Sequence, residues 1–497
     1  MPIRILSINL IKPFNPCSHM RFNNFLLPFL CCLASSYGCK KQTGEIKKRN
    51  IIFIICDDLR PELGCYGHSK IKTPNIDRWA KQSVVFERAY CNIAVSGASR
   101  ASLLTGYRPT KNTLSKWDAR ADVDVADAIT LQQHLRNNGY KTIANGKVYH
   151  HQDEESMQYW DEIMPPTPST PMRYLSEENI ALMEIQRETG KGKRGLFYEY
   201  GNFPEEDYLD WQIATKTIKD LKDLNNQSQP FFLSVGFILP HLPFVVPEEY
   251  WNLYNHADIE IPENYILKDG NNIPSYALAN WSELRAYSGI PDEGALTEET
   301  AKLMIHGYYA AVSFLDTQIG RVLNALNELG LDKNTSVVVI GDHGWNLGEH
   351  GTWCKHSIMN TSLNTPLIIN SPEASKAYKS NEIVEFVDLY PTICDLAGIP
   401  TPKETEGESL FPLLISDKNK SKGYAVCRWA NGFTYIKDSY FYTEWRNNSD
   451  SLTNCMLFDH KVDPEENNNI ASNPDHSNLI EELNKELNAK KGANFYK

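Results

Sequence analysis

Three short apolar runs, rich in β-branched residues, constrain the fold of this chain more than any other feature. They occupy residues 51–56 (IIFIIC), 231–236 and 336–340. Strands that are covered on both faces are typically continuous apolar runs, and a helical pattern over residues 301–329 precedes the third run. A further helix is expected over residues 382–396. This alternation predicts an α/β fold with a mostly parallel sheet.

Polar residues follow two of these runs directly. Asp57 and Asp58 come after the first run, and Asp342 and His343 come after the third. In open α/β sheets, ligands bind beyond the carboxyl ends of the strands, so both clusters should lie at one edge of the sheet. Carboxylate-rich sets of hard ligands suit Ca²⁺ or Mg²⁺. The four residues are therefore candidate metal ligands, and the alternative for an Asp-Asp pair alone is a solvated turn.

A third polar passage, SGASRASLLTG, occupies residues 96–106. Ser96 and Gly97 can begin a helix, where free backbone N–H groups and the helix dipole favour an anion. Arg100 lies one turn further along the same face, so an anion such as sulfate would find positive charge there. The alternative is a capped helix with no further role, because Ser before an apolar periodic run is the usual start of a helix.

The passage at residues 96–106 resembles the signature of the sulfatase family, which reads Cys or Ser, any residue, Pro or Ala, Ser, Arg, then Thr-Gly. DHGWNLGEHG at residues 342–351, with Lys355 close behind, is similar to a second sulfatase passage. The resemblance runs from about Asn50 to Leu414 and is strongest to iduronate-2-sulfatase-like bacterial sulfatases. It implies an alkaline-phosphatase-like fold: a mostly parallel central sheet flanked by helices, and a smaller C-terminal α+β subdomain with an antiparallel sheet.

The resemblance also implies a chemistry for the candidate residues. Ser96 would be oxidised to formylglycine (3-oxoalanine) by a maturase, and the metal ligands Asp57, Asp58, Asp342 and His343 would hold Ca²⁺, with Mg²⁺ less favoured. The side chains implied around the sulfate are Arg100, Lys147, His150, His241 and Lys355.

Three of these side chains carry specific implied roles. Lys147 and His150 match a Lys-any-any-His pair that binds the sulfate and the formylglycine hydroxyl. His241, in Pro-His-Leu-Pro, would donate a proton to the leaving oxygen. Taken alone, Lys147 and His150 are also compatible with an ordinary surface pair, and His241 with a buried structural histidine.

The expected function is hydrolysis of a sulfate ester on a carbohydrate, such as a glycosaminoglycan or another sulfated polysaccharide. Leu239 stands where iduronate-2-sulfatases have a Lys, which removes a partner for a uronate carboxylate. Ser96 replaces the Cys of the animal enzymes and implies a bacterial, serine-type maturation system. Two alternatives remain: a phosphomonoesterase or phosphodiesterase of the same superfamily that uses unmodified Ser96, and a catalytically silent glycan-binding lipoprotein.

The N-terminal residues predict export. Arg21 precedes an apolar stretch at residues 25–33 that is too short to span a membrane, and small residues follow up to Cys39. This ending resembles a bacterial lipoprotein signal, so we expect a lipid on Cys39, Met20 as the true start, and a place in the periplasm or outer membrane. Membrane contact is expected only through that anchor. The net charge of -12 argues against nucleic acid as a partner.

Composition divides the 497 residues into four parts. The expected parts are a leader (1–39), a Lys-rich linker (40–49), a catalytic domain (50–415) and a C-terminal subdomain (416–497). Segments 153–207 and 254–298 lack a clear period and read as insertions, which in enzymes often shape the substrate pocket.

Overall fold

The computed structural model describes residues 48–151, 153–164, 173–267, 270–279, 281–447, 449 and 451–490. The expectations for the leader, for Met20 and for Cys39 lie outside these residues. Residues 47–497 belong to one compact unit. Among the described helices, none combines the length and the apolar character that crossing a membrane requires.

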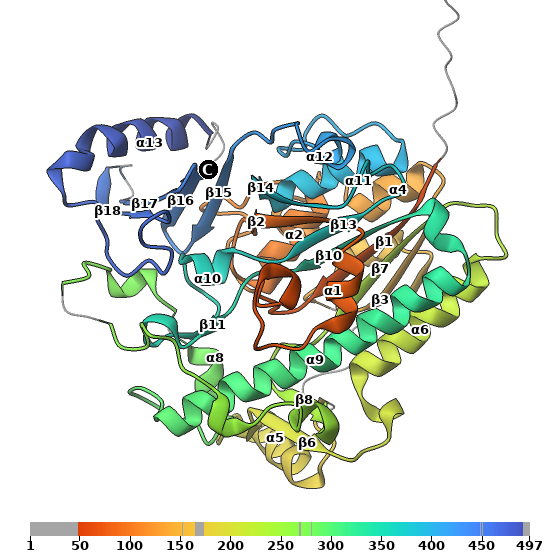
Figure 1. Ribbon diagram of the computed structural model, residues 1–497, viewed down its shortest axis with the longest axis horizontal. Helices are drawn as coiled ribbons and strands as arrows, with labels where there is room; N and C mark the ends of the chain where they lie inside the picture. The colour runs from red at the N-terminus through yellow and green to blue at the C-terminus, as the bar shows by residue number, and fades with distance from the viewer. Residues whose placement is uncertain are drawn as a thin grey trace, which may run out of the picture. The chain divides into compact units, whose positions relative to one another are not determined.

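An eight-stranded sheet lies at the centre of this unit, as the sequence predicted (Figure 1). In sheet order, its strands are β14 (Tyr378–Glu385), β2 (Val84–Tyr90), β13 (Leu367–Asn370), β10 (Thr335–Gly341), β1 (Asn50–Cys56), β7 (Phe231–Phe237), β3 (Lys141–Gly146) and β4 (Glu162–Met164). β13 runs antiparallel to both of its neighbours, and every other pair is parallel. The three apolar runs are the central strands β1, β7 and β10.

Helices cover both faces of this sheet (Figure 1). They are α1 (Pro74–Ala80), α6 (Leu209–Leu224) and α9 (Glu298–Glu328) on one face, and α2 (Ser96–Thr105), α4 (Leu131–Asn137) and α11 (Leu389–Ala397) on the other. The side chains of β1 alternate between the two cores: Ile52 and Ile54 pack with the first set, and Ile51, Phe53 and Ile55 with the second. All five are fully buried, which explains the uninterrupted apolar run.

The expected helix over residues 382–396 is wrong in its first half. Residues up to Glu385 belong to β14, a 3-10 turn at Phe386–Asp388 follows, and α11 begins at Leu389. β14 is an edge strand of the sheet and pairs with β2 alone. It keeps exposed polar residues such as Lys379. A strand of this kind lacks the continuous apolar run of the central strands.

A four-stranded antiparallel sheet forms the C-terminal part, as expected. Its strands are β15 (Tyr424–Trp429), β16 (Gly432–Lys437), β17 (Tyr440–Arg446) and β18 (Leu452–Asp459), and α13 (Ser477–Lys490) follows. Tyr435 and Tyr442 pack against Leu483 and Leu487 of α13. Side chains on the other face, including Phe441, join the core that contains α2 and α11.

Short elements fill the two expected insertions and the remaining connections. They are α3 (Ala121–Asp124), α5 (Glu177–Thr189), β5 (Arg194–Leu196), β6 (Tyr198–Gly201), β8 (Phe244–Pro247), α7 (Glu248–Trp251), α8 (Ser282–Arg285), β9 (Tyr287–Ser288), β11 (Asn346–Leu347), β12 (Trp353–Cys354), α10 (Asn360–Leu363) and α12 (Phe411–Ile415). β5 lies in the first insertion and pairs in parallel with β9 of the second. The two insertions therefore contact each other directly.

Candidate active site

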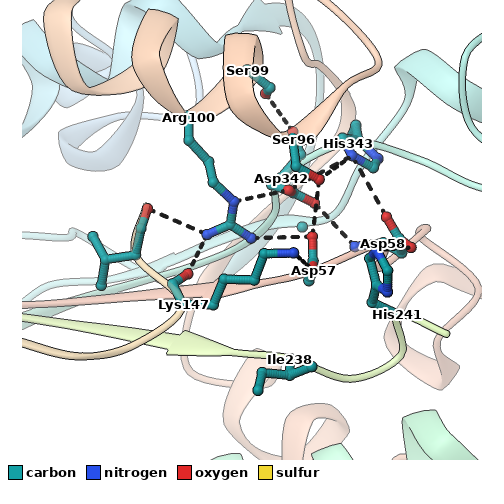
Figure 2. Close-up of polar contacts among 12 residues, drawn as sticks. Asp57, Asp58, Ser96, Ser99, Arg100, Lys147, Ile238, His241, Asp342 and His343 are labelled. Carbon is teal, nitrogen blue, oxygen red and sulfur yellow. Dashed lines mark hydrogen bonds and ion pairs between the residues drawn. The ribbon is translucent and has the colours of Figure 1, made fainter. Parts of the chain in front are cut away.

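Ser96 is the first residue of α2, and its side chain points toward the predicted metal ligands (Figure 2). Its hydroxyl oxygen lies 3.1 Å from Asp57 Oδ1 and 2.9 Å from His343 Nε2. The residue is 2% exposed. A second serine of the helix, Ser99, donates to the carbonyl oxygen of Asp342 at 2.5 Å and so fastens α2 to the end of β10.

The four predicted ligands, Asp57, Asp58, Asp342 and His343, meet at the carboxyl edge of the sheet. All four are fully buried, and each offers one ligand atom within 4.8 Å of the others. Asp58 has a left-handed backbone (φ 66°), which Asp adopts more readily than most residues. Its N–H group donates to Asp342 Oδ1 at 3.0 Å. This sharp turn after β1 brings two consecutive carboxylates to one point.

Each buried carboxylate has a cationic partner. Arg100 Nε lies 3.0 Å from Asp342 Oδ2, and Lys147 Nζ forms an ion pair with Asp57. Lys355 Nζ lies 2.8 Å from Asp58 Oδ1. Because a buried charge is costly without a partner, this pairing is what allows the charged groups to be buried together.

The nearby cations compensate the carboxylates of Asp57 and Asp58 to different extents. Burial raises the pKa of Asp57, but Lys147, His241 and Arg100 outweigh burial and hold that pKa well below its usual range. At Asp58, burial and the neighbouring carboxylates prevail over Lys355, so its pKa is raised well above the usual range. The protein cations therefore compensate the ionised form of Asp58 less completely than that of Asp57. Three carboxylates and an imidazole at this spacing are a donor set that fits a divalent cation.

Lys147 and His150 lie in the loop that follows β3. Lys147 is 6% exposed, and its carbonyl oxygen accepts a hydrogen bond from Arg100. Among the described residues, His150 Nδ1 is buried without a hydrogen-bond partner, and no described contact joins His150 to Ser96. Burial, together with the charge of Lys147, lowers the pKa of His150 to about 2, so its imidazole is neutral.

His241 lies beyond the carboxyl end of β7, next to the candidate metal ligands (Figure 2). Its Nε2 is 3.9 Å from Asp58 Oδ2 and 3.0 Å from Glu283 Oε1. On the other side of the ring, Nδ1 is 2.7 Å from the carbonyl oxygen of Leu242 and 3.1 Å from Arg173 Nη1. Burial, with the positive charge of Lys355, lowers the pKa of His241 to about 4.

Two residues near the site have no signal in the sequence. Glu283 belongs to α8 in the second insertion, and Arg173 belongs to the first. Neither stands at a fixed spacing from a motif, and the contacts of both with His241 arise from the tertiary fold. Only the expectation that the insertions shape the pocket pointed in their direction.

A family model described as sulfatase matches residues 49–399. The chain belongs to the sulfatase family. A second model, described as N-sulphoglucosamine sulphohydrolase, C-terminal, matches residues 348–493 of this sulfatase. The expected enzyme class, a sulfuric ester hydrolase, is thereby confirmed.

Known relatives cover most of this sulfatase. The iduronate 2-sulfatase of Mus musculus is 32% identical over 421 residues, which cover 77% of this chain and 74% of the mouse protein. A sulfatase of Formosa agariphila is 31% identical over 487 residues, which cover 93% of this chain and 91% of that protein.

A solved structure confirms the fold. The structure of BT4656 in complex with its substrate D-glucosamine-2-N,6-O-disulfate matches with a TM-score of 0.69 and 24% identity, and covers 90% of this chain and 98% of that chain. At this level of identity the match speaks for the fold alone.

Proposed function

We propose that this sulfatase hydrolyses a sulfate ester on a carbohydrate, with formylglycine at position 96 as the nucleophile. One observation carries the proposal: the Ser96 hydroxyl lies at a helix entrance, in hydrogen-bonding distance of Asp57 and His343. A saccharide substrate is supported by the relatives, because one of them is named iduronate 2-sulfatase.

An unmodified serine hydroxyl is a weak nucleophile and needs activation. The hydrated aldehyde of formylglycine supplies one hydroxyl that attacks sulfur and a second hydroxyl whose ionisation expels sulfate. The free N–H groups at the start of α2 and the helix dipole favour the negative charge of the ester at this place.

The remaining side chains have separate proposed roles. Arg100 already donates to Asp342, Asp57 and the carbonyl oxygen of Lys147, so it orients the ligands and contributes positive charge from behind them. The ammonium groups of Lys147 and Lys355 neutralise the sulfuryl oxygens. A divalent cation held by the four ligands, which we propose is Ca²⁺ rather than Mg²⁺, would act as a Lewis acid on a sulfate oxygen.

Two histidines handle protons in this proposal. His150 is neutral, as a proton acceptor must be. The negative charge of the bound sulfate raises the proton affinity of its imidazole, which then accepts the proton of the remaining hydroxyl at position 96. His241 donates from Nε2 to the departing sugar oxygen. A bound ester places a negative charge beside Nε2, which raises the proton affinity of the imidazole.

Mass spectrometry of the peptide that contains residue 96 tests the nucleophile. Oxidation of Ser96 to formylglycine removes two hydrogens, so the peptide should be about two mass units lighter than the same peptide with unmodified serine as the nucleophile. The protein should come from a host with a serine-type maturase. Intact serine in protein that is active on phosphate esters would favour an unmodified Ser96 phosphoesterase instead.

Sulfate release from a panel of defined sulfated saccharides tests the substrate class. We expect turnover of at least one saccharide by the matured enzyme and none by a Ser96→Ala variant. Binding of sulfated saccharides without turnover, by protein that carries formylglycine, would favour a catalytically silent glycan-binding protein.

Export stays a proposal of its own. We propose that the chain begins at Met20 and carries a lipid on Cys39. We also propose that the catalytic domain ends at residue 415, after which the C-terminal subdomain begins. Metabolic labelling with a fatty-acid analogue tests the anchor, since a Cys39→Ala variant should lose the label and leave the membrane fraction.

A further inference from the structure

Glu283 is a partly buried carboxylate that the proposed reaction does not use, yet it contacts two of the side chains that do. Its Oε1 lies 3.0 Å from His241 Nε2, and its Oε2 lies 3.2 Å from Lys355 Nζ. The exposed fractions of the three side chains are 17% for Glu283, 11% for His241 and 5% for Lys355. One carboxylate thus spans the imidazole and the ammonium group.

The contacts of the His241 ring determine where its proton lies. Arg173 can only donate, so if Nδ1 accepts from Arg173, the single ring proton of a neutral imidazole is on Nε2. If Nδ1 instead donates to the carbonyl oxygen of Leu242, an Nε2 that bonds to a carboxylate must also carry a proton. Both arrangements place an N–H group on Nε2 that points at Glu283.

Glu283 is itself in the form that accepts such a hydrogen bond. Burial raises its pKa, but the charges of Lys355 and His241 outweigh burial and keep the pKa well below its usual range. The carboxylate is therefore ionised, and it can accept from Nε2 and from the ammonium group of Lys355 at the same time.

Packing within the second insertion places Glu283. α8 begins after Trp281, whose backbone is left-handed (φ 37°), and the Arg285 guanidinium lies 3.6 Å from the centroid of the Trp281 ring. The next side chain, Leu284, is fully buried. β9 follows immediately and pairs with β5. Glu283 thus lies in a short helix whose neighbouring residues on both sides are packed or paired.

We propose that Glu283 is a positioning residue for the departure of the alcohol, an inference that rests on the proposed role of His241 as proton donor. Glu283 keeps the Nε2–H group of His241 beside the Lys355 ammonium, where a bound ester oxygen can share the Nε2–H hydrogen bond with the carboxylate. In the step itself the bond from sulfur to the ester oxygen breaks, and that oxygen keeps the electron pair. It takes the Nε2 proton of a His241 ring that also carries a proton on Nδ1, directed at the carbonyl oxygen of Leu242, so the ring ends as neutral imidazole. The attacking hydroxyl at position 96 gives its proton to Asp57, whose Oδ1 lies 3.1 Å from the Ser96 oxygen, and its oxygen bonds to sulfur. Glu283 remains a carboxylate throughout.

Leaving-group dependence tests this proposal, because a weakly basic phenolate needs less help from a proton donor than a strongly basic one. Matured wild type, Glu283→Gln and Glu283→Asp are compared on 4-nitrophenyl sulfate and on phenyl sulfate. We expect Glu283→Gln to lose about 10- to 100-fold in kcat on phenyl sulfate but much less on 4-nitrophenyl sulfate, with KM little changed. Glu283→Asp should recover part of the loss. Glu293→Gln, at an exposed position of the same insertion, is the matched control.

Equal losses on the two esters would overturn the proposal, because they indicate a general structural role. A gain in activity would also overturn it, since the carboxylate would then compete with the substrate for the two cations. Melting temperatures of the variants show whether each one folds. If the matured wild type hydrolyses neither aryl sulfates nor the saccharide panel, the proposed function itself fails and this inference fails with it.

Discussion

Charged side chains at the carboxyl edge of the central sheet are held in pairs, so the removal of one partner leaves the other unpaired. Arg100 shows this most clearly, because its guanidinium bonds to Asp342, Asp57 and backbone carbonyl groups, and it is 1% exposed. Substitutions here therefore test the chemistry cleanly only where they leave the ion pairs intact. Ser96 is such a position, since its side chain is neutral.

Ser96→Ala should reduce sulfate release by at least about 10³-fold, as expected for the loss of a nucleophile that acts in concert with its neighbours. Its melting temperature should stay close to that of the wild type, because every ion pair is kept. Ser102→Ala is a control in the same helix, since its hydroxyl bonds only to the carbonyl oxygen of Tyr107 among the contacts described. Retained turnover in Ser96→Ala would exclude the proposed nucleophile.

Removal of divalent cations should lower both activity and stability. The carboxylates of Asp57, Asp58 and Asp342 are buried together, and a bound cation offsets their repulsion in the folded state only. Saturation at about 100 times Kd would add roughly 2.7 kcal/mol to the free energy of unfolding. Calorimetric melting after chelation, and again after addition of Ca²⁺ or Mg²⁺, measures the effect. A melting temperature that ignores chelator and cation alike would argue against the metal site.

At the level of elements, the close approach of β7 to the end of β3 determines the position of Lys147. Gly236 in β7 faces the start of the loop after β3, and a Cβ at this glycine would lie 2.0 Å from the carbonyl carbon of Lys147. Only a residue without a side chain fits between the two strands here. The register of β7 against β3 is thus coupled to the site.

Gly236→Ala should push the Lys147 backbone away from Asp57. We expect a loss of about 1–3 kcal/mol in the free energy of unfolding from the overpacking and a fall of at least about 10-fold in kcat/KM from the displaced ammonium group. Ser234→Ala is the control on the same strand, because the Ser234 hydroxyl is buried without a hydrogen-bond partner among the described residues. Unchanged kinetics in a folded Gly236→Ala variant would contradict the coupling.

Sequence patterns predicted the elements whose buried faces leave a regular apolar pattern in the sequence. The central strands were predicted because both of their faces are covered, which leaves a continuous apolar run, and α2 because Ser96 starts a periodic stretch. β14 was missed because it is an edge strand with exposed polar residues such as Lys379. Glu283 was missed for a different reason: its role follows from contacts with His241 and Lys355, which lie far away in the sequence.

On the scale of the whole molecule, a buried ionic cluster ties the C-terminal sheet to the central one. Lys422, just before β15, lies 2.6 Å from Glu385 and 2.5 Å from Asp388. Arg108, in the loop after α2, also forms an ion pair with Glu385, and the side chain of Glu385 accepts from the backbone of Val426 at 3.2 Å. Loss of this cluster would remove the ionic contacts between two sheets that also share a hydrophobic core.

The pH dependence of stability should report on this cluster. Burial raises the pKa of Glu385, but Arg108 and Lys422 outweigh it and lower the pKa from 4.5 to about 2. The carboxylate therefore stabilises the fold at pH values above 4.5, and this contribution is lost as the pH falls toward 2. A shift of this size corresponds to roughly 3 kcal/mol.

Urea unfolding between pH 7 and pH 3 measures this contribution as the difference in the free energy of unfolding between wild type and Glu385→Gln. The variant should be less stable at neutral pH, and the gap should narrow on acidification. Glu481→Gln, at an exposed position of α13, is expected to follow the wild type throughout. A gap that stays constant with pH would mean that the charge of Glu385 contributes nothing.

The candidate active site is built from two parts of the chain, the edge of the central sheet and the two insertions that the pairing of β5 with β9 joins. In the proposed reaction, the side chains around the sulfuryl group come from the sheet edge and α2. Arg173 and Glu283, which contact the proposed proton donor His241, come from the two insertions. The two insertions can therefore vary together on the alcohol side only where a carboxylate in the position of Glu283 still pairs with Lys355. Within that constraint, a different alcohol requires no change in Ser96 or in the four candidate metal ligands.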